Sequence, residues 1–361
     1  MGVPTASAPV TQRQRPGRRL FRSGVWCGYL AALAVVSIVF GIPTDRVYQA
    51  AWIMVGIAAF NPHRPWREHV RILIDWVPLI AALVVYDHTR GIADKLGMPI
   101  RVEELVSVES WLFGGTIPTV WLQEHLMTGD ERPWWSVLTG IVYTSHFIVP
   151  WLVAAIFYVQ SRGRFSKYMR RIVLLSYLGL LTYILVPAAP PWYASREGVI
   201  PEDVGRVSGF GFGMVSFDTS ADWLEAQGNL VAALPSLHAA FSLMVAVALW
   251  PYAPKWFRVI LALYPPAMAF TLVYGGEHYT VDVLLGWAYV GVTILLARAW
   301  ERRRPPPPDE PRELVPADPR ELSSADPRGP SPAGSRVPPP AEPCRPSPEP
   351  REPSPADSQE N

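Results

Sequence analysis

Residues 257–300 read FRVILALYPPAMAFTLVYGGEHYTVDVLLGWAYVGVTILLARAW, and this stretch decides the fold. It holds two long apolar runs, 257–275 and 279–300, which are separated only by a short polar segment. A helix needs about 20 apolar residues to cross the hydrocarbon core of a bilayer. Both runs have about that length, so the stretch predicts two transmembrane helices joined by a tight connection.

Similar runs continue upstream. Half of the 361 residues are hydrophobic and 17% are charged. Nearly all the long apolar runs lie in residues 1–300, which excludes an ordinary soluble enzyme for that part of the chain. We predict an all-α, multispanning transmembrane helical bundle of about eight spans. One predicted span is short and alternatively lies in the membrane interface. The six upstream candidates are 24–42, the short 46–61, 70–89, 135–159, 168–188 and 234–252.

The end of the chain has a different composition. Residues 301–361 hold 19 of the 39 prolines and no aromatic residue, and such a segment cannot bury enough apolar surface to fold. We therefore predict three parts: a basic cytoplasmic arm at 1–23, a transmembrane domain at 24–300, and a disordered, Pro-rich cytoplasmic tail at 301–361. The tail is either inert or binds a cytoplasmic partner.

Charge predicts the topology. The N-terminal arm and the connections 61–71, 160–171 and near 255 hold 15 basic residues against one acid, Glu68. The long connections 87–134 and 189–233 hold 14 acids against 6 bases. Because basic connections stay in the cytoplasm, eight spans place both termini there and both acidic loops outside the plasma membrane. Neither half of the chain is basic enough to predict a nucleic-acid partner.

Two polar clusters open predicted spans at the outer side. They are Pro235-Ser236-Leu237-His238 and Glu277-His278-Tyr279-Thr280-Val281-Asp282. His278 and Asp282 are four residues apart, so on a helix they share a face and the carboxylate can hold one ring nitrogen. The other nitrogen is then a nucleophile or base, and His238 can protonate a leaving oxygen. Helix starts also favour anions, so the pattern predicts phosphoryl transfer at the outer leaflet.

Other readings of these clusters stay open. A single histidine at a membrane interface is more often structural than catalytic. Two histidines and one aspartate can also ligate zinc with an open position. There is no HExxH motif and no cysteine ligand nearby, so we expect neither a metal nor a cofactor.

The two clusters resemble the second and third signature motifs of the type-2 phosphatidic acid phosphatase superfamily. The PSLH motif, the HYxxD motif followed by Gly286, and the APPW motif at 189–192 are most similar to its inositolphosphotransferase branch, which includes fungal inositol-phosphorylceramide synthase. The resemblance is closest to actinobacterial members. It implies a phosphatase-like core of six spans. It also implies that His278 forms a phosphohistidine, that Asp282 orients it, and that His238 protonates the leaving group.

The sequence departs from the superfamily where phosphate-binding cations are expected. No convincing first motif is present, and Thr271-Leu272 replaces a Ser-Arg pair. Other cations must then meet the phosphate, and Arg90 is the first candidate, followed by Arg196. The remaining candidate substrate-binding residues come from the motifs and from the polar stretch YTSHF: Ser236, Trp192, Tyr143 and His146. His146 and Tyr143 alternatively bond a neighbouring helix.

Two further expectations concern structure. The outer segment 101–126 is amphipathic and is expected to lie on the membrane surface and cover the site. Asp75 lies near the inner end of its span, so a structural ion pair is expected for it.

The favoured function is transfer of a phospho-headgroup, with inositol phosphate as the favoured one, from a phospholipid donor to a lipid hydroxyl acceptor. If water replaces the acceptor, the same first step hydrolyses a lipid phosphate or a polyprenyl diphosphate. A non-catalytic membrane scaffold that recruits partners through its tail is a further alternative. A transporter is disfavoured, because the polar residues gather at one depth.

Overall fold

The computed structural model describes residues 16–40, 46–92, 96–127, 133–207 and 232–303. The predicted tail, beyond its first residues, and most of the basic arm lie outside these ranges. The described part of the chain is helical, and it contains only isolated β-bridges, between Arg101 and Ala188 and between Ala188 and Ala232. The elements are α1 (Pro16–Phe40), α2 (Arg46–Phe60), α3 (Trp66–Gly91), α4 (Glu103–Leu112), α5 (Pro118–Leu126), α6 (Ser136–Gln160), α7 (Arg162–Leu185), α8 (Pro191–Arg196), α11 (Leu237–Leu249), the 3₁₀ helix η2 (Trp250–Tyr252), α12 (Lys255–Tyr274) and α13 (Thr280–Arg302).

Six of the described helices are long and apolar enough to cross a membrane, namely α1, α3, α6, α7, α12 and α13. Two shorter apolar helices, Val47–Phe60 and Leu237–Tyr252, complete the predicted set of about eight. The predicted all-α multispanning bundle is thereby confirmed. The span predicted at 234–252 is shorter than expected, because Ser236 caps its helix: the Ser236 hydroxyl accepts the Ala239 N–H at 3.3 Å.

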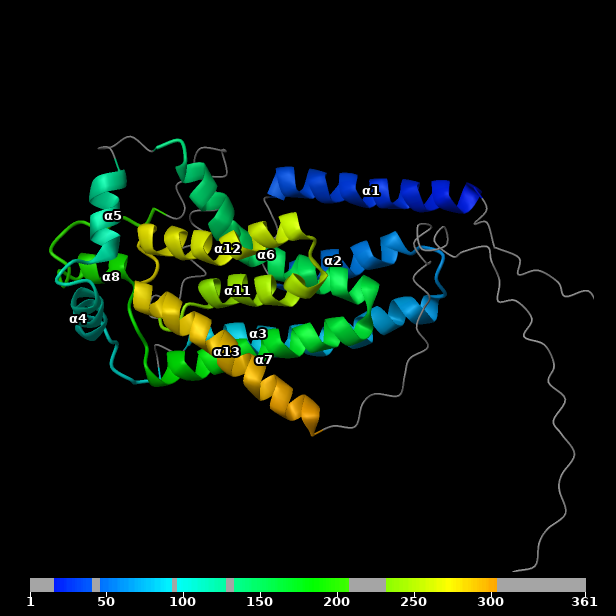
Figure 1. The fold of residues 1–361 in the computed structure, drawn as a ribbon. Helices are drawn as coiled ribbons and strands as arrows, with labels where there is room; N and C mark the ends of the chain where they lie inside the picture. The colour runs from blue at the N-terminus through cyan, green and yellow to red at the C-terminus, as the bar shows by residue number, and fades with distance from the viewer. Residues whose placement is uncertain (1–15, 41–45, 93–95, 128–132, 208–231, 304–361) are drawn as a thin grey trace, which may run out of the picture. The chain divides into compact units, whose positions relative to one another are not determined.

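The spanning helices pack around a core that runs along α3, α6, α7, α11 and α13 (Figure 1). Trp76, Leu83, Met169 and Leu175 are completely buried there. The outward faces carry many exposed apolar side chains, as a lipid-facing surface requires. α1 packs against α2 at the periphery of this bundle.

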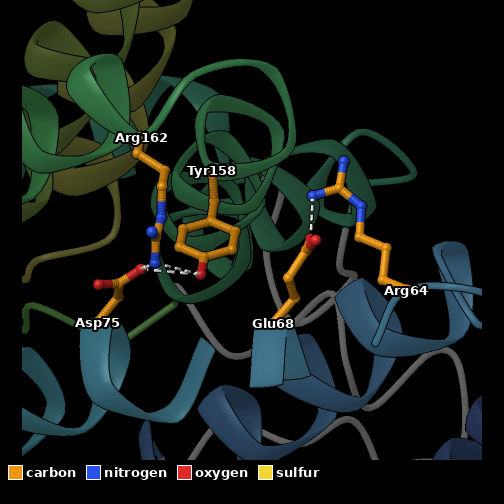
Figure 2. A network of polar contacts seen from close by, with 5 residues as sticks. All are labelled: Arg64, Glu68, Asp75, Tyr158 and Arg162. Carbon is orange, nitrogen blue, oxygen red and sulfur yellow. Dashed lines mark hydrogen bonds and ion pairs between the residues drawn. The ribbon is translucent and has the colours of Figure 1, made fainter. Parts of the chain in front are cut away.

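Asp75 makes the structural ion pair that the sequence predicts. Its carboxylate contacts the Arg162 guanidinium and accepts the Tyr158 hydroxyl at 2.9 Å (Figure 2). A second pair, Arg64–Glu68 at 2.7 Å, lies beside it. The contacts of Asp75 join the first half of α3 to the junction between α6 and α7, where Ser161 ends one helix and caps the next.

The short helices α4, α5 and α8 gather at one end of the bundle (Figure 1). The predicted amphipathic segment 101–126 forms α4 and α5, with a turn between them. Leu105 of α4 packs in a small core with Ile200, Val204 and Tyr279. The beginnings of α11 and α13 lie under these short helices, so this end of the bundle holds the candidate site.

Candidate active site

A tight connection between α12 and α13 positions His278. Gly276 has a φ of 73°, and a Cβ there would lie 2.9 Å from the Gly205 carbonyl oxygen, so only glycine fits. The N–H groups of Glu277 and His278 then both donate to the Leu272 carbonyl, at 3.1 and 3.3 Å. The buried His278 ring is therefore fixed by backbone geometry just before α13 begins.

Asp282 contacts His278, although not by the predicted route. His278 lies outside the helix, one residue before its N-cap, so the two residues do not share a helical face. The Asp282 carboxylate instead turns back over the first turn, where Oδ2 accepts the Tyr279 N–H at 2.9 Å. The same oxygen lies 3.4 Å from His278 Nδ1. This leaves His278 Nε2 as the ring nitrogen that is not directed at the carboxylate.

His238 lies in the first turn of α11, and its ring centroid is 5.7 Å from that of His278. Its ring is partly exposed, but its Nε2 atom is buried and makes no hydrogen bond in the described structure. The two predicted histidines therefore face one small volume. A group bound between them can contact both rings.

Close helix packing holds the two histidines together. The Ser236 N–H donates to the Asp282 carbonyl oxygen at 3.0 Å. Gly286 lies one turn further along α13, and a Cβ there would lie only 2.3 Å from the Ser236 carbonyl oxygen. Ser236 is completely buried and its hydroxyl caps α11, so the structure gives it a structural role. Its predicted contact with substrate stays a prediction.

Tyr143 and His146 of α6 line the same volume. The His146 ring centroid is 4.0 Å from that of His238, and the Tyr143 ring stacks on His238 at 5.0 Å. The Phe147 ring contacts the rings of His146 and His238 edge-on. Both candidates from the YTSHF stretch are thus brought to the site, where they enclose His238.

The predicted cations divide into one that lies at the site and one that does not. Arg90, at the end of α3, interacts electrostatically with the His238 ring. Arg196 has a side chain that is 56% exposed, and it pairs with Glu197 at 3.5 Å. Its guanidinium lies over the Tyr193 ring, 4.7 Å from the centroid. Arg196 is therefore a surface residue in this structure.

Arg206, which the sequence analysis did not single out, is the arginine of this loop that interacts with the site. Its Nε donates to the Glu277 carboxylate at 2.8 Å, and its guanidinium lies 5.4 Å from the Trp192 ring centroid. It also interacts electrostatically with His238. Burial lowers the Arg206 pKa, but the charge of Glu277 more than offsets this, so the pKa is raised and the cation is retained.

The composition of the loop could have indicated Arg206 as a candidate. The acidic loop 189–233 contains only two basic residues, Arg196 and Arg206. Trp192, the remaining predicted substrate-binding residue, contacts both of these arginines. The backbone N–H of Trp192 donates to the Gly276 carbonyl at 3.2 Å, so α8 is bonded to the connection that carries His278.

Two buried polar residues of the covering helices were also missed. Glu109 of α4 is completely buried, and its two oxygens accept the N–H groups of Thr280 at 2.8 Å and Val281 at 3.2 Å. Gln123 of α5 accepts the Gly205 N–H at 2.9 Å and donates to the Gly205 carbonyl at 2.9 Å. Glu109 therefore fixes the start of α13, and Gln123 fixes the backbone beside Arg206.

These contacts correct one expectation about anion binding. Both helix starts were expected to favour the phosphate, but at the start of α13 three N–H groups are taken by Asp282 and Glu109. Arg90 and Arg206 are the two arginines that interact electrostatically with His238. Among the described residues, no group of three or more His, Cys, Asp or Glu side chains is arranged to hold a metal ion.

Comparison with known proteins identifies the family of the chain. A profile of the PAP2 superfamily matches residues 103–296, which include both histidines, the aspartate and the covering helices. The chain belongs to the PAP2 superfamily.

Two of its relatives in this superfamily have named activities. Phosphoinositol dihydroceramide synthase from Bacteroides thetaiotaomicron is 28% identical over 272 residues, which are 70% of this chain and 84% of the relative. Inositol phosphorylceramide synthase from Candida albicans is 26% identical over 230 residues, 60% of this chain and 46% of the relative. The chain thus spans about half the length of this fungal relative. No solved structure matches the chain significantly.

Proposed function

We propose that this PAP2 superfamily member is a membrane enzyme that transfers inositol phosphate from phosphatidylinositol to the hydroxyl of a ceramide-type lipid. One observation carries the proposal: the ring centroids of His238 and His278 are 5.7 Å apart, and Arg90 and Arg206 interact electrostatically with His238. The names of the bacterial and fungal relatives support this headgroup and this class of acceptor.

In the first half-reaction, His278 is the nucleophile. Its Nε2 forms a bond to the donor phosphorus while the bond to the diacylglycerol oxygen breaks. His238 gives its proton to that oxygen, so diacylglycerol leaves and a phosphohistidine remains. Asp282, 3.4 Å from Nδ1, stabilises the positive charge that develops on the His278 ring. Arg90 and Arg206 meet the negative charge on the phosphoryl oxygens.

The second half-reaction reverses these roles. His238 takes the proton from the acceptor hydroxyl, whose oxygen forms a bond to phosphorus. The bond between phosphorus and His278 then breaks and the enzyme is restored. Water in place of the lipid hydroxyl would give hydrolysis, so a lipid acceptor must outcompete it.

The proposed location is the plasma membrane, with both termini in the cytoplasm and the site at the outer face. The support is the distribution of charge between the connections. A reporter that is active only in the cytoplasm, fused after residue 303, is expected to be active. A second fusion within the acidic loop 189–233 is expected to be inactive, and the reverse pattern would overturn this orientation.

The activity is tested with detergent-purified protein and phosphatidylinositol labelled in its phosphate, with and without ceramide. A labelled ceramide product that forms only with the acceptor, and is absent with His278→Ala, is the expected result. Release of labelled inositol phosphate irrespective of ceramide would identify a hydrolase instead. If the wild type leaves the donor intact under all conditions, phosphatidylinositol is not its donor and the proposal is wrong.

A further inference from the structure

A cavity lies between α7, α11, α12 and α13 and extends to the C-terminal end of α13, which is the end opposite the histidines. Its volume is about 730 Å³, which is within the usual range for binding sites of small ligands. The wall of the cavity is largely apolar and includes Leu243, Val247, Leu261, Pro265 and Trp287. The phosphoryl-transfer chemistry does not use any of these residues.

The same cavity is lined by three cations. Lys167, Arg171 and Arg298 face a single acid, Glu301. Glu301 is already shared, because Arg171 lies 3.6 Å and Lys167 4.0 Å from its carboxylate. No acidic side chain of the described residues pairs with Arg298. The cavity therefore has an excess of positive charge beside an apolar wall.

Two buried donors in the lining also lack a described partner. Arg171 Nε and Trp287 Nε1 are inaccessible to solvent and make no hydrogen bond within the described part of the chain. A buried donor without an acceptor is destabilising in general, so a ligand whose phosphate accepts from the Arg171 guanidinium stabilises this end of the cavity.

We propose that this cavity binds an anionic glycerophospholipid. Its phosphate pairs with Arg171, Arg298 and Lys167, and an acyl chain covers the apolar wall, which includes Trp287. Basic pockets between transmembrane helices bind anionic lipid headgroups in this way. The bound lipid is separate from the substrates of the transfer reaction.

The test measures lipid binding to the full-length protein by native mass spectrometry and by the rise in Tm. The probes are phosphatidylglycerol, zwitterionic phosphatidylcholine, and glycerol phosphate, which has the headgroup charge but no acyl chain. We expect phosphatidylglycerol alone to bind and to raise the Tm. The inactive His278→Ala variant is expected to behave like the wild type, which separates this result from that of the transfer assay.

Substitutions in the cavity are expected to change the affinity for phosphatidylglycerol in opposite directions. Arg171→Gln with Arg298→Gln is expected to weaken phosphatidylglycerol binding by about tenfold or more, because two of the three cations are lost. Glu301→Gln is expected to strengthen it, because the competing acid is removed. Arg302→Gln, at an exposed position that does not line the cavity, is the matched control and is expected to change little. Equal binding of phosphatidylcholine, or equal loss with Arg302→Gln, would overturn the proposal, as would stabilisation by glycerol phosphate alone.

Discussion

At the scale of single residues, the proposed mechanism depends on the contact between His278 and Asp282. Asp282 is completely buried and has one oxygen directed at His278 Nδ1. In the proposed mechanism this carboxylate favours the tautomer with the proton on Nδ1, which leaves Nε2 as the nucleophile. Without that charge, we expect the other tautomer to compete.

Asp282→Asn is expected to lower kcat by roughly 10²–10⁴, by analogy with the carboxylate of a catalytic triad. The measurement is the rate of product formation with labelled donor, together with the fraction of enzyme carrying phosphohistidine. Full activity of the folded variant would mean that the contact is only structural.

The two arginines of the loop that contains α8 give a matched pair of variants. Arg206→Gln is expected to lower kcat/KM by about 10²-fold, because a cation at the phosphoryl group is lost. Arg196→Gln, on the exposed surface, is expected to stay within about twofold of the wild type. Equal losses in both variants would show that Arg206 acts through the charge of the loop rather than at the site.

Glu109 is a positioning residue, because it contacts the start of α13 and not the histidines themselves. Glu109→Gln replaces one acceptor oxygen with a donor, so one N–H of Thr280 or Val281 loses its partner. We expect kcat to fall about tenfold with little change in KM. Glu104→Gln, on the same helix but exposed, is the control. A change in KM alone would contradict this role.

At the scale of elements, the site exists because α11 and α13 approach very closely at their starts. Gly286→Ala would place a Cβ 2.3 Å from a backbone oxygen of Ser236, so the helices must separate. We expect a stability loss of about 1–3 kcal/mol, seen as a lower Tm, and a large loss of activity as His238 and His278 move apart.

Gly291→Ala on the same helix is the control, because a Cβ there has no neighbour within 4 Å. It is expected to keep full activity and to gain up to about 1 kcal/mol from better helix propensity. If both variants behaved alike, the close approach at Gly286 would have no special importance.

The elements also show which features a sequence predicts well. Apolar runs predict the spans, because length and hydropathy are local properties. The histidines and Asp282 are predicted by their spacing. Glu109, Gln123 and Arg206 could not be predicted this way, since their partners lie 70 or more residues away along the chain. The predicted route by which Asp282 reaches His278 was wrong, because periodicity does not reveal that the helix begins at Thr280, two residues after His278.

At the scale of the whole molecule, the matched superfamily region ends at residue 296, before the proline-rich tail. Removal of 305–361 is expected to leave the transfer rate in detergent unchanged within about twofold, since none of the site residues lies there. The comparison of truncated and full-length protein at equal concentration tests this. A marked loss of activity would assign the tail a part in catalysis.

Gln123 holds Gly205 at both its N–H and its carbonyl, and Gly205 directly precedes Arg206. The path of the backbone at Arg206 is therefore held by a side chain of α5, 82 positions earlier in the chain. A substitution of Gln123 would shift the backbone that carries Arg206, although no residue of the site itself had been altered.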